Sequence, residues 1–149
     1  MNVNVQKLDE RAVLPTYGSE EAAGMDLYAL IGEEKNVTIF PNQTTFIHTG
    51  IAMEIPKGYV GLIFARSGLA CKGGLAPANK VGVIDSDYRG EIMVALHNHY
   101  NSEDSLIQIK DGERIAQMVI VPYEKAELNV VNKLDDTARS NGGFGSTGK

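Results

Sequence analysis

The sequence predicts an antiparallel all-β protein, built as a sandwich or a barrel. Three observations support this fold class. Apolar runs of strand length are closely spaced, turn residues recur between them, and no long segment has the 3.6-residue apolar period of a helix. Short strands separated by frequent turns are typical of sandwiches and barrels. A chain of 149 residues is long enough to form one domain with its own core.

The expected strands are bounded by turn residues in chain order. Residues 3–6 alternate polar and apolar side chains, and 37–39 do the same before a Pro-Asn turn. Residues 46–55 are strand-like with a glycine break, and 59–64 begin another strand after Pro-Lys-Gly. Further strands are expected at 81–84, 91–98, 106–109, 114–121 and 126–131.

The only expected helix is short and covers residues 67–72, with Ser67 able to act as its N-cap. Residues 133–149 hold many small and charged residues and one aromatic, Phe144, and cannot bury enough apolar area to fold alone. We therefore expect a β domain over residues 1–132 followed by a flexible C-terminal tail.

Composition and charge argue against nucleic-acid-binding, membrane-spanning and secreted proteins. The net charge is −5 and no basic stripe is present, so nucleic acid is not an expected partner. No apolar run approaches the ~20 residues of a membrane helix, and the N-terminal segment lacks the features of a secretory signal. Cys71 is the only cysteine, which fits a reducing cytoplasm, and we expect it to be a small packed side chain. A cytoplasmic protein is therefore expected.

Residues 82–92 form an acid-rich turn between two apolar runs. Asp, Ser and Gly favour tight reversals and β-branched flanks favour strands, so the segment predicts a β-hairpin. A hairpin held by buried strands can preorganise reactive groups, whereas an isolated turn of this composition is more often a solvated loop. Local sequence does not choose between Asp85 and Asp87, because alternation places both on one face.

Residues 65–69 (Ala-Arg-Ser-Gly-Leu) join a strand to the short helix. Free N–H groups at a helix start and the cation of Arg66 can together bind a phosphate-sized anion. An ordinary N-cap beside a surface arginine explains the same residues equally well. A hydrolase nucleophile at Ser67 is less favoured, because the nucleophile elbow needs glycine where Ala65 stands.

Two further polar residues lie in apolar surroundings. Gln117 belongs to a strand with apolar residues on both faces, where it shares a face with Ile115 and Val119 if the strand is regular. A buried amide needs partners, which are either a ligand or the neighbouring backbone. Asp26 is either a turn-former or a carboxylate that holds the water shell of a metal ion.

The end of the chain is rich in glycine. Residues 143–149 match the spacing of a Walker A loop. That loop also needs a preceding strand, a Ser or Thr after the lysine and a helix that meets the phosphates, and the sequence stops at Lys149, so we reject it. The C-terminal segment from residue 139 still offers many backbone N–H groups, one arginine and one aromatic side chain. Such a segment is suited to closing over an anionic ligand that carries a flat ring. Composition alone would favour a disordered tail.

Five segments, taken together, resemble the trimeric deoxyuridine triphosphatases (dUTP diphosphatases). The segments occur in the family's order with compatible spacing, and they are residues 23–29 (AGMDLYA), 65–70 (ARSGLA), 82–90 (GVIDSDYRG), 112–117 (GERIAQ) and 139–148. One departure is Ala65, which stands where many members have proline and should alter loop stiffness more than chemistry.

The resemblance implies a distorted jelly-roll-like β-barrel, assembled as a homotrimer with active sites between subunits. It also implies Mg²⁺-assisted hydrolysis of dUTP to dUMP and pyrophosphate by water that attacks the α-phosphorus. This activity limits uracil in DNA and supplies dUMP for dTMP synthesis.

The resemblance also implies residue roles. Asp85 would orient and deprotonate the water, and Tyr88 would pack under the deoxyribose and leave no room for a 2′-hydroxyl. Asp26 would hold waters around an Mg²⁺ that sits mainly on the triphosphate. The other expected substrate contacts are Asn79 and Val83 on the uracil side, Arg66, Ser67, Gly68 and Gln117 on the phosphates, and from the tail Arg139 on the γ-phosphate, Phe144 on uracil, and Gly145, Ser146 and Thr147 on phosphates.

Two alternatives remain at the level of sequence. One is a dCTP deaminase or bifunctional relative on the same fold, although the Arg-Ser-Ser variant of that family is absent, and ammonia release from dCTP would identify it. The other is a nucleotide-binding regulatory protein that has kept the fold without the activity.

Overall fold

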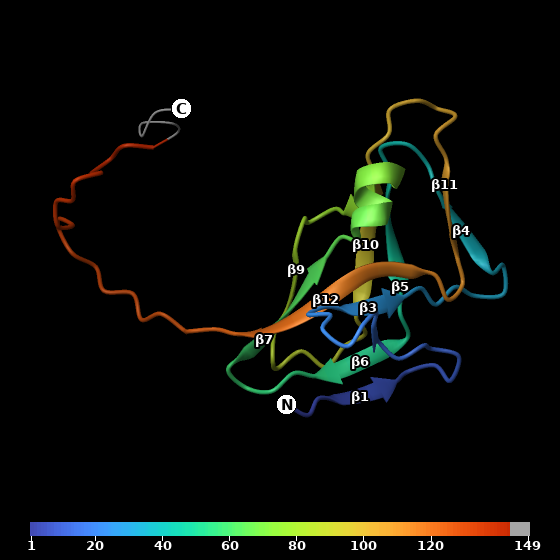
Figure 1. Ribbon diagram of the computed structural model, residues 1–149, viewed down its shortest axis with the longest axis horizontal. Helices are drawn as coiled ribbons and strands as arrows, with labels where there is room; N and C mark the ends of the chain where they lie inside the picture. The colour runs from blue at the N-terminus through green and yellow to red at the C-terminus, as the bar shows by residue number, and fades with distance from the viewer. Residues whose placement is uncertain (144–149) are drawn as a thin grey trace.

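The computed structural model describes residues 1–143, and this part of the chain is almost entirely β-structure (Figure 1). The prediction of an all-β fold is confirmed. The strands are β1 (Asn4–Lys7), β2 (Thr16–Tyr17), β3 (Met25–Tyr28), β4 (Asn36–Ile39), β5 (Thr44–His48), β6 (Ile51–Glu54), β7 (Tyr59–Phe64), β8 (Leu75–Pro77), β9 (Gly82–Ile84), β10 (Met93–Asn98), β11 (Ile107–Lys110) and β12 (Arg114–Pro122).

The strands form four antiparallel sheets that do not close into one continuous barrel. The largest has the order β2-β3-β12-β7-β9, and a second has the order β5-β10-β8. β1 pairs with β6 and β4 pairs with β11. β12 lies between β3 and β7 in the largest sheet, so its backbone is paired along both edges.

The core lies between these sheets. Leu27 of β3, Leu96 of β10 and Met118 of β12 are fully buried in one apolar cluster. Each such side chain contributes about 1.5–3 kcal/mol through its removal from water. Asn98 is also fully buried, and its amide donates to the carbonyls of Ile39 and Ser105, so this polar group is paired.

The predicted hairpin over residues 82–92 is wrong in its strand pairing. β9 pairs with β7, whereas β10 pairs with β5 and β8, so the strands before and after the turn belong to different sheets. The local sequence indicates the reversal and the two strands correctly. It does not specify the partners, because pairing depends on segments far away in the chain. The acid-rich turn therefore connects two sheets.

The break predicted within residues 46–55 is present. β5 and β6 are separated by Thr49 and Gly50, and Gly50 has a φ of +68°. A Cβ at Gly50 would lie 2.5 Å from Cδ2 of Leu30 and 2.9 Å from Cβ of Ala12. Both the left-handed backbone and the close packing therefore require glycine.

The predicted helix appears as the short π-type helix η1 (Gly68–Lys72). Ser67 precedes it but makes no side-chain capping hydrogen bond, so the predicted capping role is wrong. Ser67 has helical dihedral angles, whereas a capping residue needs an extended backbone to turn its hydroxyl toward the first turn. Cys71 is exposed rather than packed, because η1 buries none of its residues.

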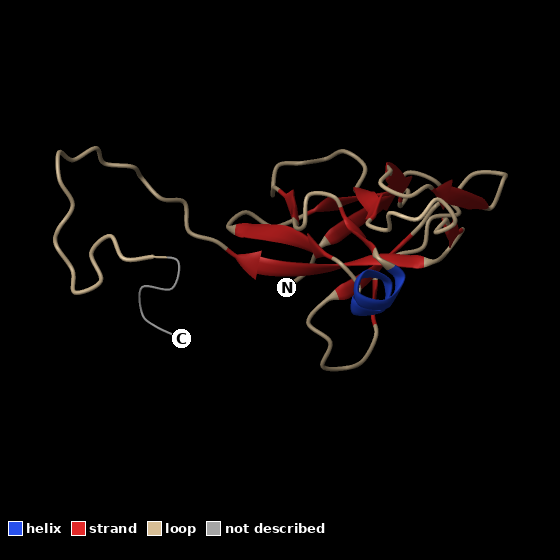
Figure 2. Ribbon diagram, turned by 90° about the horizontal axis from the view of Figure 1, so that it is seen from above, coloured by secondary structure: helices blue, strands red, loops and turns tan. Residues whose placement is uncertain are grey.

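The strand predicted at 126–131 is not formed. β12 ends at Pro122, and the chain from 123 to 143 leaves the β-structure as an extended segment (Figures 1 and 2). The side chains of Leu128 and Val130 are 93% and 95% exposed. Within residues 1–143, no helix is long and apolar enough to cross a membrane.

Candidate active site

A cluster of one carboxylate and two guanidinium groups lies at the end of β7. Oδ1 of Asp26 accepts a hydrogen bond from Nε of Arg66 at 2.9 Å, and Oδ2 accepts one from Nη1 of Arg114 at 3.1 Å. Nη1 of Arg66 also donates to the backbone carbonyl of Arg114 at 3.1 Å. The Asp26 side chain is only 13% exposed, and its pair with Arg66 is better shielded from water than its pair with Arg114, whose side chain is 49% exposed.

A β-bulge places Arg114 and Gln117 on the same face. The register of β12 against β3 shifts between Arg114 and Ala116, so Arg114 lies opposite Tyr28 and Gln117 lies opposite Asp26. Residues three apart point to opposite faces of a regular strand. The extra residue of the bulge removes that alternation and turns both side chains toward Asp26. The sequence analysis assumed a regular strand, and this assumption is wrong between Arg114 and Ala116.

Gln117 connects β12 to the loop that carries Arg66. Its Nε2 donates to the backbone carbonyl of Ala65 at 3.0 Å, so the neighbouring backbone is one partner of this amide. A Cβ at Gly24 would lie 3.2 Å from Oε1 of Gln117, which leaves little space beside the amide for any residue other than glycine. Ser67 and Gly68 follow Arg66 and are exposed. We call Asp26, Arg66, Ser67, Gly68, Arg114 and Gln117 the arginine cluster.

A separate cavity of about 200 Å³ lies beside the acid-rich turn. Its lining residues are Phe46, Val83, Ile84, Asp85, Tyr88, Glu91 and Met93. Apolar side chains from β5, β9 and β10 thus surround two carboxylates and one phenol, a composition suited to a ring or a sugar that carries a reacting group. We call this group the turn cavity.

Asp85 and Asp87 are placed differently. Asp85 lines the turn cavity beside Tyr88, whereas Asp87 does not line it. Asp87 lines a larger, more polar cavity of about 650 Å³ together with Lys57 and Arg89. Both acids also line a further cavity of about 440 Å³ beside residues 123–126, so the turn cavity is the feature that distinguishes Asp85. Asn79 lies beyond the opposite end of β9 and is exposed.

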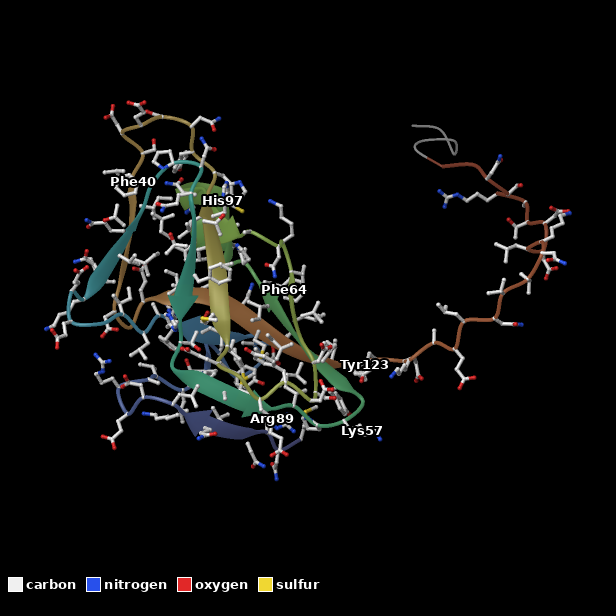
Figure 3. The ribbon with its side chains drawn as sticks, turned by 180° about the vertical axis from the view of Figure 1, so that it is seen from behind. Phe40, Lys57, Phe64, Arg89, His97 and Tyr123 are labelled. Atoms are coloured by element: carbon white, nitrogen blue, oxygen red, sulfur yellow. The ribbon has the colours of Figure 1, made fainter. Side chains whose placement is uncertain are left out.

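The arginine cluster and the turn cavity lie far apart within one chain. In the pairing of β7 with β9, Gly61 lies opposite Ile84, so continued pairing would place Asp85 opposite Val60. Arg66 is six residues beyond Val60, which corresponds to about 20 Å along an extended strand at ~3.3 Å per residue. Figure 3 shows Phe64, near the arginine cluster, well separated from Arg89 of the acid-rich turn.

The tail residues are not brought to either group. Arg139 is exposed on the extended segment, and its Nε donates to the carbonyl of Gly142 at 2.9 Å. Figure 2 shows this part of the chain well away from the sheets. The expected contacts of Phe144, Gly145, Ser146 and Thr147 fall outside the described residues.

Arg114 and Glu91 were missed as candidate residues. A regular strand would turn Arg114 away from Gln117, and the bulge leaves no signal that can be read from the sequence. Glu91 lies near the end of the acid-rich turn, and its partners are about 40 residues earlier in the chain, so local sequence could not indicate them. Its Oε2 accepts from Nδ1 of His48 and its Oε1 accepts from the backbone N–H of Gly50, each at 2.8 Å.

The surroundings of Glu91 lower its pKa below the ordinary 4.5. Burial of the carboxylate opposes this shift, but the hydrogen bonds from His48 and Gly50 outweigh it. A depressed pKa in the folded state stabilises the protein above the unfolded pKa, and this contribution is lost as the pH falls through the folded value.

Glu91→Gln is therefore expected to reduce stability by an amount that depends on pH. The difference in free energy of unfolding between wild type and Glu91→Gln should be fully present above the ordinary pKa of 4.5 and should shrink as the pH falls from neutral to below that value. Denaturant unfolding at a series of pH values measures this difference. A difference that stays constant over this range would show that the carboxylate gains nothing from its charge.

The donor set around Asp26 is compatible with a metal ion held through water. Within the described part of the chain, no group of three or more His, Cys, Asp or Glu side chains could hold a metal ion alone. Mg²⁺ commonly keeps several waters and binds through one or two carboxylates together with substrate phosphates. Asp26 supplies one such carboxylate, beside two cations suited to phosphate oxygens.

Comparison with known proteins identifies the family. The family model described as dUTPase matches residues 10–148. The chain is 48% identical over 149 residues to the deoxyuridine 5′-triphosphate nucleotidohydrolase of Nautilia profundicola, with 100% of both chains covered. It is 53% identical over 141 residues to the protein of the same name from Desulfitobacterium hafniense, with 94% of this chain and 90% of the relative covered.

Solved structures agree with this result. The fold is similar to the dUTPase of Staphylococcus bacteriophage 80alpha with dUPNHPP, with a TM-score of 0.89, 29% identity and 99% of both chains covered. It is also similar to a mutant dUTPase from phage phi11 of S. aureus described with a structural Mg(II) ion, with a TM-score of 0.80, 28% identity, and 89% of this chain and 98% of that chain covered. The chain therefore belongs to the dUTPase family.

Proposed function

We propose that this protein hydrolyses dUTP to dUMP and pyrophosphate at sites shared between the chains of a homotrimer. The observation that carries the proposal is the division of the candidate residues into a turn cavity and an arginine cluster in a chain of the dUTPase family. The first group suits a nucleoside, and the second suits a phosphate chain. Neither group alone could hold the substrate and also attack it.

The turn cavity is assigned to the nucleoside and to the attacking water. Asp85 acts as the general base, because its carboxylate lies in the cavity beside the proposed sugar site. Tyr88 packs under the deoxyribose, where its ring leaves no room for a 2′-hydroxyl. Asn79 and the backbone of β9 near Val83 read the donor and acceptor pattern of uracil, and cytosine would leave these groups unpaired.

The arginine cluster is assigned to the triphosphate. Asp26 and the carbonyl of Arg114 fix the guanidinium of Arg66, so its remaining N–H groups are oriented before substrate arrives. Ser67, Gly68 and Gln117 complete the phosphate contacts. Asp26 is the carboxylate that would hold the water shell of Mg²⁺, and a bound Mg²⁺ would neutralise triphosphate charge that otherwise opposes the attacking nucleophile.

The separation of the two groups supports a shared site. The water activated by Asp85 must reach the α-phosphorus, and Arg66 must contact the same short phosphate chain. About 20 Å of β-structure separates these residues in one chain, so the turn cavity of one chain would meet the arginine cluster of another. Closed homo-oligomers commonly form such repeated interfaces.

The extended tail supports the same arrangement. Leu128 and Val130 alternate with polar residues in a strand-like pattern, yet they are almost fully exposed in a single chain. Strand addition on a second copy would cover them. Residues 133–149 would then reach a neighbouring site, where Arg139 binds the γ-phosphate, Phe144 stacks on uracil, and Gly145, Ser146 and Thr147 bind phosphates.

Mixing two inactive variants tests the shared site. Asp85→Asn disables the turn cavity, and Arg66→Ala disables the arginine cluster. After co-refolding of equal amounts, about one quarter of the sites should combine an intact half from each variant, and about that fraction of wild-type pyrophosphate release should return. Each variant refolded by itself under the same conditions is the control, and it should stay inactive.

Failure can be assigned to one part of the proposal. Mixed oligomers without activity would place both groups of one site in the same chain. If wild-type protein with Mg²⁺ releases no pyrophosphate from dUTP, the activity itself is refuted and a nucleotide-binding role is favoured. Ammonia release from dCTP would instead identify the deaminase alternative.

A further inference from the structure

We propose that Glu91 is a positioning residue for Tyr88 and thereby sets how strongly the enzyme rejects UTP. The inference rests on the proposed function, since it assigns the source of specificity within the same site. Glu91 lines the turn cavity, but its carboxylate is engaged by the turn between β5 and β6. It therefore acts through the backbone that supports the tyrosine.

Four hydrogen bonds connect residues 91 and 92 to residues 48–51, which we call the β5–β6 turn. The Glu91 carboxylate accepts from His48 and from the backbone N–H of Gly50. The backbone N–H of Ile92 donates to the carbonyl of Ile51 at 2.9 Å, and the hydroxyl of Thr49 donates to the carbonyl of Ile92. Two of the four bonds depend on the Glu91 side chain.

The β5–β6 turn is a rigid anchor. Gly50 packs against Leu30 and Ala12 with no space for a Cβ, and Thr49, Gly50 and Ile51 are all buried. A backbone fixed in this way has little freedom to follow a shift of its partner. The position of residue 91 is therefore set by the core beneath β5 and β6.

The ring of Tyr88 depends on the same backbone. Its hydroxyl donates to the carbonyl of Glu91 at 2.9 Å. A Cβ at Gly90 would lie 2.5 Å from that hydroxyl and 2.6 Å from Cζ, so the ring lies directly over the glycine. Tyr88 is otherwise exposed. Residues 90 and 91 thus form the surface on which the ring rests.

Rejection of a ribonucleotide depends on a small clearance, because UTP differs from dUTP by one hydroxyl. A shift of about 1 Å in a positioning group can change rates by orders of magnitude. Without the Glu91 carboxylate, residue 91 loses its two direct hydrogen bonds to the anchor, only the bonds of Ile92 remain, and the ring can yield to the 2′-hydroxyl. The expected effect is a relative gain for UTP, together with a loss of kcat/KM for dUTP.

The test compares kcat/KM for dUTP and UTP. Glu91→Ala should raise the UTP/dUTP ratio by about tenfold. Glu91→Gln should restore much of the discrimination, because its amide oxygen can still accept from the Gly50 N–H. Asp111→Ala is the matched control, since it removes a comparable carboxylate bond to the backbone N–H of Ile31. It should leave the ratio unchanged.

A double mutant separates positioning from general destabilisation. In a Tyr88→Ala background, Glu91→Ala should have no further effect on the UTP/dUTP ratio, because the residue it positions is absent. An unchanged ratio in Glu91→Ala, or an equal shift in Asp111→Ala, would overturn the inference. A wild-type protein that does not hydrolyse dUTP would refute the proposed function instead, so the two failures are distinguishable.

Discussion

Replacing Asp85 with asparagine is expected to lower kcat for dUTP by about 10³-fold while leaving dUTP binding nearly unchanged. The amide keeps the size of the carboxylate and one accepting oxygen, but it cannot remove a proton from the attacking water. Pyrophosphate release measures kcat, and titration calorimetry with dUTP and Mg²⁺ measures Kd.

Asp87→Asn is the matched control for this prediction. Asp87 stands two residues from Asp85 but does not line the turn cavity, so its amide should leave turnover close to wild type. Normal turnover in Asp85→Asn would refute its role as the base. Equal losses in the two variants would show that the turn as a whole, rather than one carboxylate, is required.

Deleting residues 139–149 is expected to lower kcat/KM by at least about 100-fold. The deletion removes Arg139, Phe144 and the backbone amides proposed to close over the phosphates and uracil. β12 ends at Pro122, and the segment after it is exposed throughout most of its length, so the folded body should keep its stability. Turnover and thermal unfolding, measured on the same preparation, test both statements.

Arg139→Ala isolates one contribution of the tail. It keeps the chain length and the glycine-rich segment but removes the proposed γ-phosphate contact, so its loss of activity should be smaller than that of the deletion. A tail deletion with wild-type turnover would show that the active site is complete without these residues. A large fall in unfolding temperature would instead assign the tail to folding.

The strands were predictable where their signals are local. The runs at 59–64 and 114–121 are bounded by turns and correspond closely to β7 and β12. The predicted hairpin and the strand at 126–131 failed for a common physical reason. A strand is stable only when a partner satisfies its backbone, and the identity of that partner depends on distant segments.

The prediction of the candidate site was limited in the same way, because contacts between distant segments could not be read from local sequence. Resemblance to the family selected Asp26, Arg66 and Gln117, and the structure brings these three together. Their roles remain predictions. Arg114 and Glu91 could not be selected from local sequence, because one depends on a β-bulge and the other on a turn about 40 residues away.

The bulge in β12 also restricts how the strand can change in length. Arg114 and Gln117 share a face only because one extra residue lies between the paired positions. Deleting the extra residue would leave Arg114 and Gln117 two positions apart in a regular strand, where alternation also turns both side chains to one face. A deletion of one residue should therefore be tolerated better at the bulge than elsewhere in β12, where it would turn the side chains on one side of the deletion to the opposite face of the sheet.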